Sequence, residues 1–372
     1  MVREARVVDF FLQLCRINSP SLAEGECVQY VKKQLTEWGL DVHEDDAGQK
    51  IGGNGNNLIV RVPATAEGKP TVFLSAHFDT VEPTVGLEIQ EVDGVFSSAS
   101  DTILGADDKA GMASAVEAVL CMIENGFPHG EILLFLSVAE EIGLKGANEI
   151  DLERWKPSFG YVLDTGPPVG SFVTRTATHD KLDITILGKP AHAGKDPEMG
   201  INAIQVAAAA ISGMRLGRIA EETTANIGII EGGTAVNVVC PKVKVRAEAR
   251  STSLEALDEQ VGHMIQRFEE AAREWGARLE IEHSRHYRSY DIAPDEEVVK
   301  HALEASRKLG MEPILRTTLG GSDANVYNAK GVPAIVVATG MEKIHTHEEQ
   351  VSRQSLVEVA TLCFEILKSA NA

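Results

Sequence analysis

The stretch TVFLSA at residues 71–76 is largely apolar on both faces of the strand that it predicts. Residues 132–138 (ILLFLSV) and 334–338 (AIVVA) have the same character. Strands of this kind are typical of a parallel sheet that helices cover on each face. Helical patterns separate these runs or follow them, at residues 23–38, 109–122, 296–309 and 352–369. The alternation predicts an α/β fold with a mostly parallel sheet.

The middle of the chain has another pattern, in which apolar and polar residues alternate. The alternating segments are residues 181–188 (KLDITILG), 242–250 (KVKVRAEAR) and 278–282 (RLEIE). Each is expected to bury one face and to leave the other in water, as in an antiparallel sheet packed against helices. Two helices and one more strand are expected between them, at residues 201–214, 254–275 and 225–230. This order of elements is that of an α+β ferredoxin-like unit.

The chain length of 372 residues favours two domains. We expect the ferredoxin-like unit to be an inserted domain at residues 178–288. The main domain is then assembled from residues 1–177 and residues 289–372.

The composition excludes several classes of function. With 35 basic and 55 acidic side chains, the formal net charge is −20, which opposes binding to nucleic acid or to anionic membranes. The apolar runs are too short to span a bilayer, and the N-terminus has no signal-peptide pattern. The five cysteines form no C-x-x-C pair, as expected in a reducing compartment. These features predict a cytoplasmic protein.

Polar residues with metal-binding side chains follow the predicted strands. His77 and Asp79 lie two apart at the end of the first apolar strand, so that one can bind a metal while the other orients it. Asp107 and Asp108 stand before a helix, where Asp108 could act as a cap, which leaves Asp107 unexplained.

Further carboxylates and histidines occur after the other strands. The adjacent Glu140 and Glu141 follow residues 132–138, Asp164 ends a further strand, and His345 follows the last apolar strand. Each motif alone is ambiguous, but ligands bind beyond the carboxyl ends of strands in open α/β sheets, where all of these groups lie. One ligand from each motif gives a set of His, Asp, Glu, Asp and His. These five ligands exceed what one catalytic zinc takes from a protein, and they match a metal pair that shares one carboxylate.

The motifs SAHFDT, GADDKAG, AEEIGLKGA, DTGP, GKPAHAG and HTHEEQV occur in this order along the chain. Together they resemble the dinuclear zinc exopeptidase family that includes peptidase T, carboxypeptidase G and the aminoacylases, and most closely its peptidase-T-like tripeptidases. The resemblance covers nearly the whole chain. It implies a zinc-exopeptidase catalytic domain and an inserted lid and dimerisation domain.

The resemblance also implies roles for the residues of the main domain. His77 and Asp164 resemble ligands of one metal, with Asp79 as the carboxylate that orients His77. Asp107 resembles the carboxylate that bridges both ions. Of the two adjacent glutamates, Glu140 resembles the general base and Glu141 a ligand of the second metal. His345 resembles the last ligand of that metal, and His347 is a competing candidate.

Three residues of the inserted domain resemble substrate-binding groups of the family. His192, in PAHAG, corresponds to a histidine that holds the scissile carbonyl oxygen. Asn237 and Arg250 correspond to residues that bind the substrate backbone and its carboxylate. Arg250 lies on the polar face of its alternating strand, as a ligand-binding residue should.

The expected function is hydrolysis of short peptides by a metal-activated water, with release of the N-terminal residue of a tripeptide. Two divalent ions are implied, Zn²⁺ first and Mn²⁺ or Co²⁺ as alternatives. An N-acyl-amino-acid amidohydrolase and a carboxypeptidase are alternatives within the family, and a non-catalytic metal-binding protein is one outside it. The resemblance also predicts a homodimer formed through the inserted domain.

Overall fold

The computed structural model describes residues 1–81 and 83–372, which form two compact units. The first, called the α/β unit, comprises Met1–Thr174, Tyr290–Thr317 and Ser322–Ala372. The second, called the inserted unit, comprises Arg175–Ser289 and the short segment Thr318–Gly321. That second segment, which the sequence did not place there, joins the inserted unit from a distant part of the chain.

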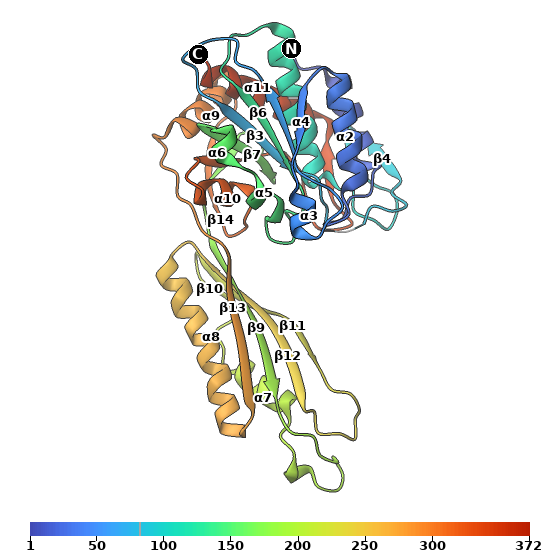
Figure 1. Cartoon of the computed structure of the whole chain (residues 1–372), viewed down its shortest axis with the longest axis vertical. Coiled ribbons are helices and arrows are strands. Elements are labelled where there is room, and N and C mark those ends of the chain that lie inside the picture. Colours follow the sequence, from blue (N-terminus) through green and yellow to red (C-terminus); the bar gives the residue numbers. More distant parts are fainter. Residues whose placement is uncertain (82) are drawn as a thin grey trace. The chain divides into compact units, whose positions relative to one another are not determined.

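Within the described residues, an eight-stranded sheet runs through the α/β unit (Figure 1). In spatial order its strands are β1 (Asp41–Glu44), β2 (Leu58–Val62), β6 (Ile132–Ser137), β3 (Val72–His77), β7 (Phe159–Thr165), β15 (Ala334–Ala338), β8 (Ser171–Thr176) and β14 (Ile314–Thr318). The central strands β6, β3, β7 and β15 are parallel, whereas β1, β2 and β8 pair antiparallel with their neighbours. A small separate sheet consists of β16 (Gln350–Ser352), β5 (Val95–Ser98) and β4 (Ile89–Val92).

Both faces of the central strands are buried because successive side chains point to opposite sides. Leu74 and Leu134 pack in the large core that helices build on one face. Phe73 and Phe135 pack on the other face with Tyr327. The helices of this unit are α1 (Glu4–Cys15), α2 (Gly25–Glu37), α3 (Ala47–Ile51), α4 (Ala106–Asn125), α5 (Lys145–Glu149), α6 (Leu152–Trp155), α9 (Glu297–Lys308), α10 (Asp323–Ala329) and α11 (Arg353–Ala370).

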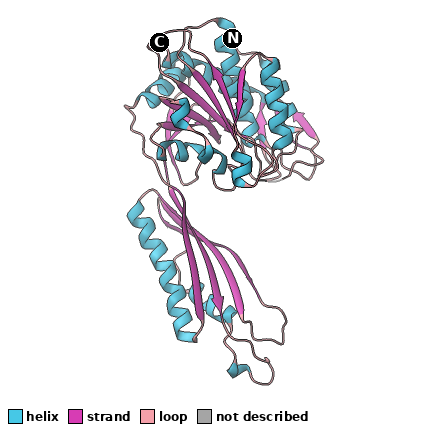
Figure 2. Cartoon of the chain, in the orientation of Figure 1, coloured by secondary structure: helices cyan, strands magenta, loops and turns pink. Residues whose placement is uncertain are grey.

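The inserted unit is an antiparallel sheet with helices on one face (Figure 2). Its strands, in spatial order, are β10 (Gly217–Ala220), β11 (Thr223–Gly232), β12 (Lys242–Ser251), β9 (Thr178–Leu187) and β13 (Arg278–Tyr287). Helices α7 (Ala203–Ser212) and α8 (Leu254–Trp275) cover alternate, buried side chains such as Val243 and Val245. The predicted ferredoxin-like order is confirmed, and the short strand β10 is an addition that the sequence did not predict.

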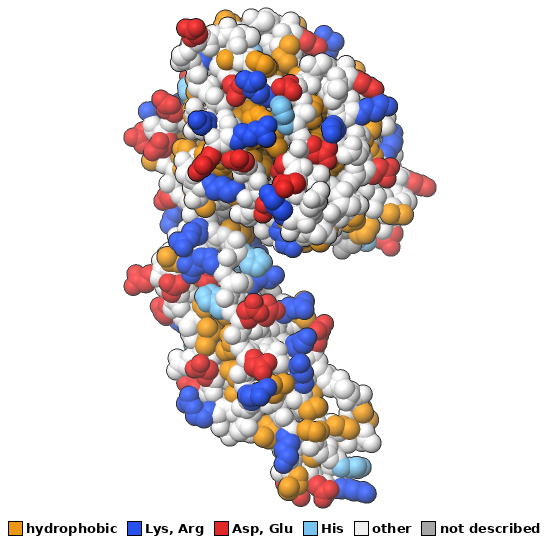
Figure 3. Space-filling view, in the orientation of Figure 1, with side chains coloured by type: hydrophobic (Ala, Val, Ile, Leu, Met, Phe, Trp, Pro, Cys, Tyr) orange, Lys and Arg blue, Asp and Glu red, His pale blue; other side chains and the backbone are white. Residues whose placement is uncertain are grey.

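The surface carries many charged side chains of both signs, as the composition indicates. Acidic and basic side chains are intermixed on the visible face of each unit (Figure 3). Among the described helices, none combines the length and the apolar character that crossing a bilayer requires.

Candidate dinuclear metal centre

The carboxyl ends of neighbouring strands bring the predicted site residues of the α/β unit together. β3 pairs in parallel with both β6 and β7, so the ends of all three strands lie at one edge of the sheet. His77 is the last residue of β3, Glu140 and Glu141 follow β6, and Asp164 lies near the end of β7. The first turn of α4 supplies Asp107. Segments far apart in the sequence thus provide the side chains of one site.

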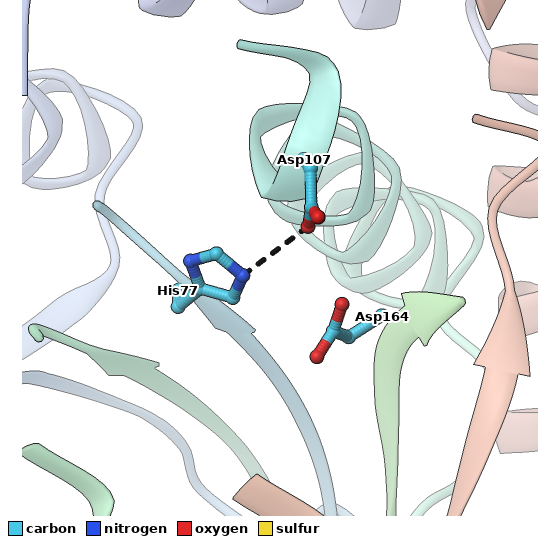
Figure 4. Close-up of side chains that lie close together, drawn as sticks. All are labelled: His77, Asp107 and Asp164. Atoms are coloured by element: carbon cyan, nitrogen blue, oxygen red, sulfur yellow. Dashed lines mark ion pairs between the residues drawn. The ribbon is translucent and has the colours of Figure 1, made fainter. Parts of the chain in front are cut away.

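Among the described residues, three overlapping groups place ligand atoms within 4.8 Å of one another. The groups are His77 with Asp107 and Asp164, Asp107 with Glu141 and His345, and His77 with Glu140 and Glu141. In the first group the side chains point toward one another from β3, α4 and β7 (Figure 4). His77, Asp107 and Glu141 each belong to two groups. Of these, Asp107 has one carboxylate oxygen 3.3 Å from His77 and the other 3.2 Å from His345, so its two oxygens face two different groups.

The His77 ring is fixed by the residue two positions later. Its Nδ1 atom lies 2.9 Å from the carbonyl oxygen of Asp79 and 3.5 Å from the Oδ1 atom of that residue. Because a carbonyl oxygen can only accept, Nδ1 carries a proton. The Nε2 atom then faces Asp107, whose Oδ1 atom lies 3.3 Å away. The main chain of Asp79 therefore makes the closer contact to His77, where the sequence had suggested its carboxylate.

The geometry separates the two histidines near the end of the chain. His345 Nε2 lies 3.2 Å from Asp107 Oδ2 and 3.0 Å from Glu141 Oε1. His347 Nδ1 instead pairs with the exposed Asp101 at 2.8 Å. The structure thus brings His345 into the site and pairs His347 with Asp101, which is in none of the ligand groups.

The electrostatics of the cluster fit bound cations. Burial raises the pKa of Asp164, and the charges of Asp107 and Glu140 raise it further. Hydrogen bonds to Asp107 and Glu141 raise the pKa of His345 to about 10. The Oδ1 atom of Asp107 is buried and has no hydrogen-bond partner among the described residues. Carboxylates and histidines crowded together in this way, buried apart from the more exposed His345, are the donor set that zinc, manganese or cobalt binds.

The turn that carries the adjacent glutamates is held by side chains that bind its backbone. Four successive N–H groups, those of residues 138–141, each donate to a side-chain oxygen. The pairs are Val138 with Asn57 Oδ1 (3.0 Å), Ala139 with Glu24 Oε1 (2.9 Å), Glu140 with Asp79 Oδ1 (2.9 Å) and Glu141 with Asp79 Oδ2 (3.1 Å). A Cβ atom on Gly146 would lie 2.1 Å from the Val138 oxygen, so this turn also needs a glycine beneath it.

The backbone around Asp107 is held in a similar way. Glu349 accepts hydrogen bonds from the N–H groups of Gly105, at 2.6 Å, and Asp107, at 3.0 Å. Asp108 makes no cap hydrogen bond to α4, because its Oδ2 atom accepts from the His77 N–H at 3.3 Å and its buried Oδ1 atom has no hydrogen-bond partner among the described residues. The capping interpretation of Asp108 is therefore wrong.

The sequence did not identify Glu24 or Asn57 as functional residues. It noted Glu349 only through the spacing H-x-x-x-E after His345. The one sequence signal at Glu24 is the pattern Ser21-x-x-Glu24, which is typical of a helix cap and does not indicate that the carboxylate is completely buried.

The three predicted residues of the inserted unit lie at two ends of its sheet. His192 and Asn237 are neighbours, because the Ala193 N–H donates to the Asn237 oxygen at 3.0 Å. Arg250 lies near the far end of β12, which begins at Lys242 after Asn237. Eight residues of extended strand span roughly 26 Å. The sequence motifs predicted substrate binding for all three residues, but within one inserted unit His192 and Asn237 lie far from Arg250.

Arg250 has a built environment at its end of the sheet. Its Nη2 atom donates to Glu248 at 3.0 Å, and its Nη1 atom to the Leu319 oxygen at 3.3 Å. The buried Nε atom has no hydrogen-bond partner among the residues described. Glu248 is also 2.9 Å from His179, and these two contacts lower the pKa of Glu248 to about 2. Arg250 thus keeps one buried donor for a further acceptor.

Comparison with known families agrees with both units. Residues 178–276 match the peptidase dimerisation domain model, and residues 57–165 match the peptidase family M28 model. The chain is 28% identical to a peptidase T of Clostridium perfringens over 351 residues, which cover 90% of this chain and 82% of the relative.

Solved structures are similar over the whole chain. The aminopeptidase PepT of Bacillus cereus is 41% identical, with a TM-score of 0.89 and 99% of each chain covered. A tripeptidase of Staphylococcus aureus is 39% identical, with a TM-score of 0.94, 100% of this chain covered and 99% of the other. The fold and the ligand groups define a metallopeptidase, a hydrolase that acts on peptide bonds. Within that class, the chain belongs to the peptidase-T-like M20 family.

Proposed function

We propose that the protein is an aminotripeptidase, which removes the N-terminal residue from short peptides with the aid of two divalent metal ions. The observation that carries this proposal is the Asp107 carboxylate, whose two oxygens face His77 and His345, the histidines of two different ligand groups. The likeness to an aminopeptidase and to a tripeptidase over nearly the full chain supports the substrate class.

The ligand groups suggest how two ions would be held. His77, Asp107 and Asp164 would hold one ion, and Asp107, Glu141 and His345 the other. Histidine nitrogens and carboxylate oxygens favour Zn²⁺, and Mn²⁺ and Co²⁺ suit the same donors. When bound, such a pair supplies the positive charge that makes water a nucleophile near neutral pH.

Glu140 is the proposed general base. It is buried and forms a third ligand group with His77 and Glu141, but the two groups proposed above for the ions do not include it. Burial raises the pKa of Glu140, which makes the carboxylate a better proton acceptor. In this role Glu140 accepts a proton from water as the peptide carbonyl is attacked, and returns the proton to the leaving amine.

The inserted unit supplies the proposed substrate-binding groups. Arg250, with its buried unpaired Nε donor, would bind the free carboxylate of a short peptide. His192 would stabilise the developing oxyanion, and Asn237 would bind the peptide backbone.

The separation of these groups favours a homodimer. A tripeptide spans roughly 10 Å, much less than the roughly 26 Å of strand between Asn237 and Arg250. A peptide held by Arg250 would therefore meet His192 of the partner subunit. The match of residues 178–276 to a dimerisation domain supports this assembly.

All five cysteines are buried and free, which suits a reducing compartment and a proposed cytoplasmic location.

Hydrolysis of defined peptides by the metal-loaded protein tests the proposal. Free tripeptides should be cleaved to one amino acid and one dipeptide, and N-acylated tripeptides should resist cleavage. Preferred release of the C-terminal residue, or of an acyl group, would instead identify a carboxypeptidase or an amidohydrolase. No turnover with Zn²⁺, Mn²⁺ or Co²⁺ would contradict any enzymatic role.

A further inference from the structure

The loop before α2 is hydrogen-bonded to the turns that carry the site. The Ser21 hydroxyl donates to Asp79 Oδ2 at 2.6 Å. Glu24 Oε1 accepts from the N–H of Ala139 at 2.9 Å, directly before Glu140 in the chain. The loop therefore supplies Glu24 to this turn and, through Ser21, contacts Asp79, which accepts from two further N–H groups of the turn.

The Glu24 carboxylate is itself fixed in place. The residue is 0% exposed, and its Oε1 atom also accepts from the Leu22 N–H at 2.9 Å. Its main chain begins helix α2, where the Val28 N–H donates to the Glu24 oxygen at 3.0 Å. The next N–H, that of Gly25, donates to Asn54 Oδ1 at 2.8 Å. Because these hydrogen bonds fix the backbone and the carboxylate of Glu24, its Oε1 atom can hold the Ala139 N–H in one position.

Ala139, whose N–H binds Glu24, adopts an uncommon backbone conformation. Ala139 has a φ of +53°, in the left-handed region that residues with a Cβ atom disfavour. Such conformations persist only where the surrounding structure holds them. On the other side of the turn, the Ala139 oxygen accepts from the Lys145 N–H at 3.0 Å. Ala139 is thus held at its N–H by Glu24 and at its carbonyl by Lys145.

We infer that Glu24 is a positioning residue for Glu140: by binding the Ala139 N–H, it holds the left-handed turn that directs the Glu140 carboxylate into the site. This inference rests on the proposed function, since it assigns proton transfer to Glu140. Glu24 belongs to none of the ligand groups. Its effect is therefore expected on the rate of the chemical step, because small displacements of a reacting group cost much rate.

Steady-state kinetics of three variants test the inference. Glu24→Ala removes the acceptor and should lower kcat by about 10- to 100-fold with little change in KM. Glu24→Gln keeps an oxygen that accepts both N–H groups and should keep kcat within a few-fold of the unaltered enzyme. Glu26→Ala, which changes an exposed glutamate of the same helix, is the matched control and should leave kcat unchanged. Bound metal, measured in each variant, should stay at the level of the unaltered enzyme.

A double variant separates loss of positioning from general destabilisation of the fold. Glycine adopts positive φ without strain, so Ala139→Gly removes the need for an external hold on the turn. The double variant Glu24→Ala/Ala139→Gly should recover part of the kcat that Glu24→Ala loses, while its Tm stays below that of the unaltered enzyme because the hydrogen bonds of the buried Glu24 carboxylate are still missing. If Glu24→Ala is too unstable for assay, Glu24→Asp gives the same comparison, because it withdraws the oxygen by one methylene.

The inference is overturned if Glu24→Gln loses as much kcat as Glu24→Ala, if the loss in Glu24→Ala is in KM, or if the double variant Glu24→Ala/Ala139→Gly recovers no kcat relative to Glu24→Ala. Failure of the proposed function would be distinct, because the unaltered enzyme would then cleave no tripeptide. An active enzyme that is insensitive to Glu24→Ala would contradict the positioning role alone.

Discussion

The Oδ2 atom of Asp107 lies 3.2 Å from the Nε2 atom of His345, although the two residues come from opposite parts of the sequence. The other oxygen of Asp107 faces His77 at 3.3 Å. One carboxylate thus separates two histidines, each of which has further carboxylates beside it. This arrangement is what a bridging ligand between two metal ions requires.

The adjacent glutamates should respond differently to the same substitution. Glu140→Gln keeps the size of the side chain but removes its proton affinity, so kcat should fall by about 10²–10⁴-fold with KM and both metals retained. Glu141→Gln weakens a proposed ligand and should lower the occupancy of one ion. Metal analysis beside kcat for both variants decides the roles. Loss of metal in Glu140→Gln and retention in Glu141→Gln would reverse them.

The two C-terminal histidines provide an internal comparison. His345→Ala removes a contact to both Asp107 and Glu141. The variant should therefore lose one of the two bound ions and nearly all peptidase activity. His347→Ala breaks an exposed pair with Asp101, which is worth little, and should leave metal content and kcat unchanged. Equal metal loss in both variants would show that His347 also serves the site.

Arg250 should act on peptides with a free carboxyl end. Loss of a charge-assisted hydrogen bond, about 1.5–3 kcal/mol, predicts a rise in KM of roughly 10- to 100-fold for Arg250→Ala. Amidated peptides should be affected much less, because they carry no carboxylate. Arg246→Ala, on the same face of β12 and paired with Asp183, is the matched control. An unaltered enzyme that cleaves free and amidated tripeptides equally well would contradict the proposed carboxylate contact.

The stability of the inserted unit should depend on pH through Asp180. This residue is 0% exposed, and its carboxylate accepts from Arg285 at 2.8 and 3.0 Å and contacts His283 at 2.7 Å. Although burial opposes the effect, the bonds to Arg285 and His283 lower the pKa of Asp180. The ionised form therefore stabilises the fold above the unfolded pKa of about 3.9, and this contribution disappears as pH falls through the lower folded value.

Urea denaturation of Asp180→Asn measures this contribution. At pH 7 the variant should lose about 1–3 kcal/mol of unfolding free energy, and the loss should shrink as the pH falls below about 4. Asp183→Asn, which alters an exposed carboxylate of the same strand, should cost less than about 1 kcal/mol at either pH. A constant difference between Asp180→Asn and the unaltered protein at all pH values would contradict the ionic account.

The sequence predicted most of the fold because its two hydrophobic patterns differ so clearly. Runs such as residues 132–138 can be buried only between two helical layers, whereas residues 242–250 alternate and need one wet face. The clustering of His77, Glu141 and Asp164 was also predictable, since the parallel strands β3, β6 and β7 end at the same edge.

The contacts that hold the site could not be predicted, because they join residues far apart in the chain. The pattern Ser21-x-x-Glu24 is typical of a local helix cap, yet the Glu24 side chain binds a backbone N–H 115 positions later. Likewise, nothing in the sequence separated Asn237 from Arg250, because their distance depends on the direction of β12. Such contacts depend on tertiary packing, to which local patterns are insensitive.

Metal stoichiometry of Asp107→Ala tests the central claim most directly. The unaltered protein, loaded with Zn²⁺ and freed of excess, should retain two ions per chain, since the two oxygens of Asp107 face the histidines of two different ligand groups. Asp107→Ala should retain fewer than one ion per chain and show no peptidase activity, while its far-UV circular dichroism stays that of the unaltered protein. Two ions retained by a folded Asp107→Ala variant would contradict the shared-carboxylate centre.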